Sequence, residues 1–168
     1  MSDKKIFKAA VIVLSDKGSR GERIDESGSV ACDYLKQFGY EVVERILIPD
    51  ESDLLKQELI RLSDEVKVNL IITSGGTGFS PRDMTPEATL EIMDRNAPGI
   101  SEYIRMKSMQ ITDRSMLSRG VSVIRKQTLI VNLPGSPKAV KEGLELILKP
   151  IGHGLVKLCG DNEDCARS

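Results

Sequence analysis

The chain has 168 residues and a formal net charge of -1, from 24 Lys and Arg against 25 Asp and Glu. Hydrophobic residues make up 40% and charged residues 29%, a composition typical of a folded domain and not of a disordered chain. The lack of a positive excess argues against a protein that wraps nucleic acid, and 4% aromatics without Trp offer few platforms for stacking bases. We therefore expect no nucleic-acid partner, one domain over residues 1–160 and a short tail over 161–168.

The start of the chain and its cysteines carry no export or membrane signal. The first apolar run, residues 9–14, is shorter than the hydrophobic core of a signal peptide or a membrane span. Three cysteines without CxxC spacing favour reduced thiols over a disulfide framework, and His153 lacks the neighbouring ligands of a zinc site. We expect a cytoplasmic protein without a membrane partner.

Strand patterns and helix patterns alternate along the first half of the chain. Short continuous apolar runs predict strands that are covered on both faces. Ser27 is the expected N-cap of the helix after the first strand, and Gly39 stands where a glycine ends a helix. The strands are expected over residues 8–14, 41–48 and 69–73, and the helices carry apolar residues over 30–38 and 54–62.

Two proline signals mark helix starts in the second half. Thr85 followed by Pro86 predicts one helix N-terminus, and Ser136 followed by Pro137 predicts another. Two β-rich runs around a polar link are typical of a hairpin. The helices carry apolar residues over 90–93, 100–111 and 140–148, the hairpin strands are 121–124 and 128–131, and a last apolar stretch covers 151–158.

This alternation predicts an α/β domain of three layers: a mostly parallel sheet, helices on both faces and a small β-hairpin. In open sheets of this class, ligands bind outside the carboxyl ends of the strands. That rule selects residues 15–28, 49–50 and 73–83, which follow the first three strands.

The most informative of these segments follows the third strand. Its sequence, TSGGTG over residues 73–78, places three glycines directly after a buried run. Glycines let the backbone approach an anion closely and present successive N–H groups to it. The chain has no Gly-Lys pair, which excludes a Walker A loop, and Pro81 occupies a position where the dinucleotide fingerprint needs a small residue. The segment is either an anion-binding loop of another kind or a tight turn without a ligand.

Two aspartates lie beside these strand ends, Asp50 after the second strand and Asp83 after the glycines. If the two strands are neighbours, both carboxylates face one crevice, where they suit Mg²⁺ held together with substrate phosphates. The competing interpretation of each is a helix N-cap, because Asp50 precedes Glu51 and Asp83 lies close to Thr85.

A second anion-binding candidate precedes the last predicted helix. The segment LPGSP, residues 133–137, follows a strand and opens a helix, so its N–H groups could hold a phosphate or carboxylate. An ordinary capped turn explains the same residues. Ser118 and Arg119 lie just before the hairpin, and the Arg119 guanidinium is either a phosphate ligand or a surface charge.

Five motifs occur together in a fixed order, and in combination they resemble the Mog/MoaB family of molybdenum-cofactor biosynthesis proteins. The resemblance covers about residues 7–158, and the stretch IRKQTLIVNLPGSPK (124–138) is especially similar to the adenylyltransferase branch. The motifs are IPDE at 48–51, TSGGTG at 73–78, SPRDMTPEAT at 80–89, MLSRG at 116–120 and LPGSPKAV at 133–140.

This resemblance implies a three-layer α/β fold, a homotrimer and binding of molybdopterin. In the adenylyltransferase branch, Mg²⁺ and ATP serve to make adenylyl-molybdopterin with release of pyrophosphate, and a separate molybdotransferase then inserts molybdate. Asp50 and Asp83 match the family's functional aspartates and are the expected Mg²⁺ ligands. The implied substrate-binding residues are Thr73, Gly75, Gly76, Thr77 and Gly78 for the nucleotide and phosphates, and Ser108, Ser118, Pro134, Gly135 and Ser136 around the pterin, with Arg119 added for its place beside Ser118.

Two other functions stay open: a MoaB-like paralogue that binds molybdopterin with weak or different catalysis, and a non-catalytic trimeric scaffold. Asp50 and Asp83 beside an intact run of glycines favour the enzyme. Asp16 and Asp25, in the charged segment 16–28, are further candidates for nucleotide contacts.

Overall fold

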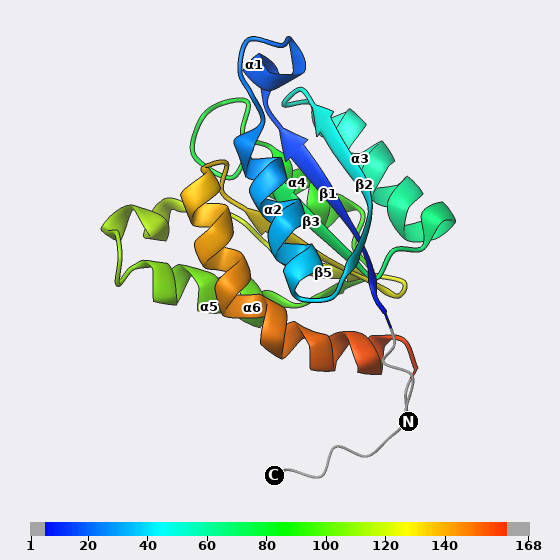
Figure 1. The fold of residues 1–168 in the computed structure, drawn as a ribbon. Coiled ribbons are helices and arrows are strands. Elements are labelled where there is room, and N and C mark those ends of the chain that lie inside the picture. The colour runs from blue at the N-terminus through cyan, green and yellow to red at the C-terminus, as the bar shows by residue number, and fades with distance from the viewer. Residues whose placement is uncertain (1–5, 161–168) are drawn as a thin grey trace.

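The computed structural model describes residues 6–160, which form one six-stranded sheet with helices on both faces (Figure 1). The strand order is β2-β1-β3-β6-β5-β4. The first four of these strands run parallel, whereas β5 is antiparallel to β6 and β4 is antiparallel to β5. The prediction of a mostly parallel sheet with a small hairpin is therefore confirmed. The strands are β1 (Lys8–Leu14), β2 (Glu41–Ile48), β3 (Leu70–Ser74), β4 (Arg95–Asn96), β5 (Ser122–Arg125) and β6 (Thr128–Leu133).

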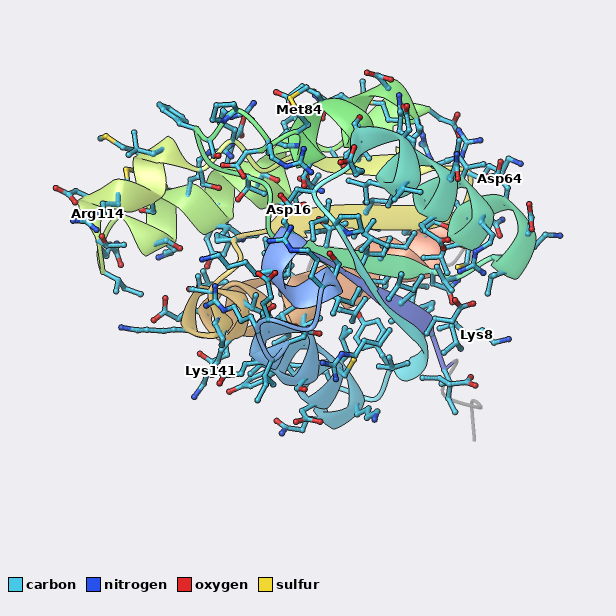
Figure 2. The ribbon with its side chains drawn as sticks, turned by 90° about the horizontal axis from the view of Figure 1, so that it is seen from above. Lys8, Asp16, Asp64, Met84, Arg114 and Lys141 are labelled. Atoms are coloured by element: carbon cyan, nitrogen blue, oxygen red, sulfur yellow. The ribbon has the colours of Figure 1, made fainter. Side chains whose placement is uncertain are left out.

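Alternate side chains of the central strands enter two separate cores. On β1, Val11 and Val13 belong to the core shared with α2 and α6, whereas Ala10 and Ile12 belong to the core shared with α3 and α4. Seen from above, the sheet lies between these two helical layers (Figure 2). One layer consists of α2 (Glu26–Gln37), α5 (Pro98–Ser108) and α6 (Pro137–Leu158), and the other of α3 (Ser52–Arg61), its π-helical continuation (Leu62–Val66) and α4 (Thr85–Glu91).

Two of the three predicted helix caps are wrong. The N-cap of α2 is Asp25, whose carboxylate accepts from the N–H of Gly28 at 2.8 Å, and Ser27 lies inside the first turn. Thr85 is the first residue of α4 and does not cap it. The prediction for α6 is confirmed, because Ser136 is its N-cap.

The last two apolar stretches form a single helix. We predicted a helix with apolar residues over 140–148 and a last apolar stretch over 151–158, and α6 runs through both, Pro150 included. It does so because Ile147, Ile151 and Leu155 stay on one face and are buried in the core against α2 and the sheet. The short strand β4 was not predicted, and the predicted tail, residues 161–168, lies outside the described residues. Among residues 6–160, none of the helices is both long and apolar enough to cross a membrane.

The topology brings several loops to one edge of the sheet. Because β1, β2, β3 and β6 are parallel, their carboxyl ends lie together, at the top of Figure 1. The short helix α1 (Asp16–Ser19) follows β1 there, and the loop after β3 and the start of α6 lie beside it. The rule that ligands bind outside the carboxyl ends of the strands, called the strand-end rule below, selected three segments after these strands. In the structure these segments meet in one place.

Candidate active site

Residues 75–78, called the glycine loop below, follow β3 and are held first by Thr85. The Thr85 hydroxyl donates to the carbonyl oxygen of Gly75 at 3.0 Å, and the Thr85 N–H donates to that of Gly76 at 3.1 Å. Both glycines have positive φ, +103° at Gly75 and +66° at Gly76, a backbone region that disfavours other residues. A Cβ on Gly75 would overlap the carbonyl oxygen of Leu14, so β1 itself requires glycine at this position.

Arg119 holds the other half of the glycine loop. Its N–H donates to the carbonyl oxygen of Thr77 at 2.8 Å, and its Nε donates to that of Gly78 at 2.8 Å. The remaining guanidinium nitrogens bond the carbonyl oxygen of Asp83 and the carboxylate of Glu87. Arg119 lines neither pocket described below, and the bonds that the structure gives its guanidinium support the glycine loop.

All carbonyl groups of the glycine loop accept hydrogen bonds, but only the first of its main-chain N–H groups donates one to the described residues. Gly75 donates to the carbonyl oxygen of Leu133 at 3.1 Å. Within residues 6–160, the N–H groups of Gly76, Thr77 and Gly78 donate to no protein acceptor. A run of unpaired N–H groups whose carbonyls are all engaged presents only positive partial charge, which is the property of an anion cradle. A tight turn without a ligand does not require this arrangement.

Asp50 is positioned by Asp16. The N–H of Asp16 donates to Oδ2 of Asp50 at 2.9 Å, and the N–H of Asp50 donates to Oδ1 of Asp16 at 3.0 Å. The other Asp50 oxygen faces the glycine loop, because Oδ1 would lie 3.6 Å from a Cβ on Gly76. Burial raises the pKa of Asp50, and the nearby charges of Asp16 and Asp83 act in the same direction. The N-cap of α3 is Glu51, so the capping interpretation of Asp50 is wrong.

Asp83 flanks the glycine loop on its other side. Its Oδ2 accepts from the N–H of Ser80 at 2.9 Å and would lie 2.9 Å from a Cβ on Gly78. The residue at the N-cap position of α4 is Met84, so Asp83 is not a cap either. Asp50 and Asp83 line the same pocket, as the strand-end rule predicted.

Two pockets meet at the glycine loop. The glycine-loop pocket has a volume of about 780 Å³ and lies at the carboxyl ends of β1, β3 and β6. The serine pocket, of about 290 Å³, lies between α5, η2 (Asp113–Leu117) and the segment before β5. Thr77, Gly78 and Pro134 line both pockets, so these residues form the wall where the two pockets adjoin.

The predicted substrate-binding residues divide between the two pockets. Ser108 and Ser118 line the serine pocket. Gly135 and Ser136, which the resemblance placed around the pterin, line the glycine-loop pocket instead. Thr73 lines neither pocket: it is fully buried, and its hydroxyl accepts from Nδ2 of Asn132 at 2.9 Å.

The serine pocket also contains polar residues that the sequence did not single out. Arg105 lines it and donates to the carbonyl oxygen of Gly120 at 2.7 Å, and Arg114, Asn132 and Glu142 also belong to its lining. No sequence motif distinguishes these residues, since their meeting depends on how α5 and α6 pack. Asp25 lines the glycine-loop pocket, but its carboxylate is used by the cap of α2 and by Arg45.

The two aspartates offer the oxygen donors that magnesium ions prefer in proteins. Asp50 Oδ1 and Asp83 Oδ1 accept no hydrogen bond from residues 6–160, so each carboxylate keeps one oxygen for a ligand. Among the described residues, no cluster of three or more His, Cys, Asp or Glu side chains could hold a metal. Mg²⁺ is commonly held by one or two carboxylates together with substrate phosphates, and that mode matches this pair.

Comparison with protein families decides the identity. The sequence model of a family described as a "Probable molybdopterin binding domain" matches residues 10–153. The chain belongs to this family. The predicted resemblance is thereby confirmed, and the match to this molybdopterin-binding domain family spans both pockets.

Individual members of the molybdopterin-binding domain family agree with this result. The molybdopterin adenylyltransferase of Haemophilus influenzae is 42% identical over 154 residues, covering 90% of this chain and 78% of that protein. A solved structure of the molybdopterin biosynthesis enzyme MoaB from Thermus thermophilus has a TM-score of 0.88 at 42% identity, covering 92% of this chain and 98% of that one. The solved structure of the Mog protein of Mycobacterium ulcerans has a TM-score of 0.86 at 37% identity, covering 94% of this chain and 99% of that one. The predicted fold and place in molybdenum-cofactor biosynthesis are confirmed.

Proposed function

We propose that this protein is a molybdopterin adenylyltransferase that uses Mg²⁺ and ATP. The observation that carries the proposal is the shared wall of Thr77, Gly78 and Pro134, where a nucleotide in one pocket and a pterin in the other meet. Curated relatives at about 40% identity, among them a protein of Escherichia coli K12, are named molybdopterin adenylyltransferase.

The two pockets suit the two substrates. The glycine-loop pocket offers the unpaired N–H groups of Gly76, Thr77 and Gly78 to the phosphates of ATP. The serine pocket, with Ser108 and Ser118 in its lining, takes molybdopterin. A phosphate of molybdopterin then faces the α-phosphate of ATP across the shared wall.

The reaction joins two anions and needs no covalent intermediate on the protein. An oxygen of the molybdopterin phosphate attacks the α-phosphorus of ATP, the bond from that phosphorus to the bridging oxygen breaks, and pyrophosphate leaves with the bonding electrons. This chain's residues align the two phosphates and stabilise the charge that develops between them. Asp50 and Asp83 would hold Mg²⁺, which when bound neutralises phosphate charge.

The assembly and cellular setting are part of the same proposal. We infer a cytoplasmic homotrimer that passes adenylyl-molybdopterin to a molybdotransferase. Support for self-association comes from an apolar groove of about 800 Å³ between α5, α6 and β5, since contiguous exposed apolar surface commonly marks an interaction site. Light scattering should give three times the monomer mass, and Tyr103→Glu, in the wall of this groove, should lower it; a monomeric wild-type protein contradicts the trimer.

The direct test is incubation with molybdopterin, ATP and Mg²⁺. The expected result is formation of adenylyl-molybdopterin with release of one pyrophosphate for each product molecule. Nucleotide binding without pyrophosphate release would instead favour the function of a MoaB-like paralogue. The 42% identity to the Thermus MoaB protein is the observation that supports this second candidate. Failure to bind either substrate would favour the scaffold.

A further inference from the structure

All but one of the charged side chains from residues 6–160 that line the glycine-loop pocket are acidic. Asp25, Glu26, Asp50 and Asp83 line it, and Arg23 is the single cationic side chain in its lining within the described part of the chain. A bound triphosphate places several negative charges near these carboxylates. Unpaired N–H groups offset part of this repulsion, and a guanidinium in the lining would offset more.

The other arginines near this pocket are engaged by the protein. Arg45 donates to the carboxylate of Asp25 at 2.6 Å. Arg82 donates to both carboxylate oxygens of Asp16, at 2.6 and 2.9 Å. Arg119 is occupied by the carbonyl groups of the glycine loop and by its other partners. None of these guanidinium groups is available to a phosphate without breaking a structural contact.

Arg23 has no such contact. It lies in the segment between α1 and α2, its side chain is exposed, and it forms no ion pair or hydrogen bond with any residue of 6–160. Arg20, in the same segment, pairs with Glu22 at 2.8 Å and does not line the pocket. Arg23 is therefore the uncommitted positive charge of this site.

The position of Arg23 indicates which phosphates it can reach. The α-phosphate must lie at the shared wall of Thr77, Gly78 and Pro134, because molybdopterin approaches it from the serine pocket. Arg23 lines only the glycine-loop pocket, so it faces a part of the nucleotide that points away from that wall. Of those parts, the β- and γ-phosphates carry the negative charge that a guanidinium binds in bidentate fashion.

We propose that Arg23 binds the β- and γ-phosphates of ATP, which leave together as pyrophosphate when the bond from the α-phosphorus to the bridging oxygen breaks. This inference rests on the proposed function, because it assumes that ATP occupies the glycine-loop pocket.

The experiment compares nucleotides that differ only in these phosphates. Calorimetry with Mg²⁺ measures the affinity of wild-type protein, Arg23→Gln and the control Arg20→Gln for ATP and for AMP. We expect Arg23→Gln to weaken ATP binding about tenfold, as for loss of a charge-assisted hydrogen bond, and to leave AMP binding unchanged. The KM for ATP should rise with that for molybdopterin unaltered, and Arg20→Gln should match the wild type in every assay.

Each alternative result has a distinct meaning. Equal weakening of ATP and AMP overturns the assignment to the β- and γ-phosphates, and so does unchanged binding of both. Wild-type protein that binds ATP but forms no adenylyl-molybdopterin overturns the proposed function, while the comparison of ATP with AMP still decides the role of Arg23. Wild-type protein that does not bind ATP overturns both proposals.

Discussion

Asp16 and Asp50 exchange hydrogen bonds, each donating its main-chain N–H to the carboxylate of the other, at 2.9 and 3.0 Å. The exchange joins the loop after β1 to the loop after β2. Arg82, in the loop after β3, donates to the same Asp16 carboxylate and thereby lowers the pKa of Asp16. One carboxylate thus ties together the ends of three neighbouring strands.

Asp16→Ala should weaken the function of Asp50 although Asp50 itself is unchanged. The substitution removes the acceptor for the Asp50 N–H and for Arg82, so kcat/KM should fall about tenfold, the effect usual for residues that support a metal ligand. Asp16→Asn keeps an oxygen acceptor for the Asp50 N–H and should retain more activity. Asp53→Ala, at a side chain that is 86% exposed, is the control. Equal losses in Asp16→Asn and Asp16→Ala would show that charge alone matters here.

Asp83→Asn should nearly abolish turnover. The neutral amide lacks the negative charge with which a carboxylate binds Mg²⁺, so turnover should fall. Asp83 does not line the serine pocket. Binding of molybdopterin, measured by fluorescence or calorimetry, should therefore stay close to that of the wild type. Activity within a few-fold of wild type would refute the role assigned to Asp83.

Arg119→Lys should behave like a loss of the residue, although it keeps the charge. A single ammonium group cannot reproduce the separate contacts of the guanidinium with Gly78, Asp83 and Glu87. Both Arg119→Lys and Arg119→Ala should reduce the free energy of unfolding by about 2 kcal/mol, because several partly buried acceptors lose their donors at once. Urea unfolding measures this change. If lysine restored wild-type stability, charge rather than fork geometry would explain Arg119.

Gly75→Ala should destabilise the fold, whereas Gly152→Ala should not. At Gly75 the added methyl group meets the Leu14 carbonyl at a φ of +103°, and we expect a loss of about 3 kcal/mol or more. At Gly152, inside α6, nothing lies within 4 Å of the added Cβ, so alanine should stabilise the helix by about 0.5–1 kcal/mol. Thermal unfolding of the pair tests both signs. Equal melting temperatures would contradict the close approach of Gly75 to β1.

The raised pKa of Asp50 predicts a stability difference that depends on pH. Burial raises this pKa, so the ionised carboxylate is less favourable in the folded state than in the unfolded state. Wild-type protein should lose stability from this group as pH rises from the ordinary value of 3.8 through the raised folded-state pKa. The Asp50→Asn variant has no ionisable group at this position and does not lose stability in this way. Its free energy of unfolding relative to that of the wild type should therefore increase over that pH window and then level off. A difference that is flat with pH would contradict the assignment.

The strand β1 could be predicted from the sequence because burial on both faces leaves a continuous apolar run, and the predicted range 8–14 coincides with it. The edge strand β2 is only partly buried, but its β-branched and apolar residues before Pro49 sufficed to predict the range 41–48. The strand-end rule also brought Asp50, Asp83 and the glycine loop together, since parallel strands must end at one edge. These features depend on patterns within a few residues.

The contacts that shape the loop could not be predicted in the same way. The Thr85 hydroxyl can cap a helix or bond a distant carbonyl, and only the packing of α4 against the glycine loop selects Gly75. Arg119 meets Gly78 across 41 residues of sequence, so no local pattern reveals whether its guanidinium faces a ligand or the backbone. Side-chain partners of this kind are set by tertiary structure.

The engagement of every glycine-loop carbonyl affects how fast the pocket fills. Rotation of a peptide plane, which would turn one of these oxygens into the pocket, must break the bond to Thr85 or Arg119. The cradle therefore keeps its shape between turnovers, and little conformational entropy is lost when a nucleotide arrives. Association of ATP should then follow a single bimolecular phase, with a rate set by diffusion and ionic strength instead of by a slow ordering of the loop.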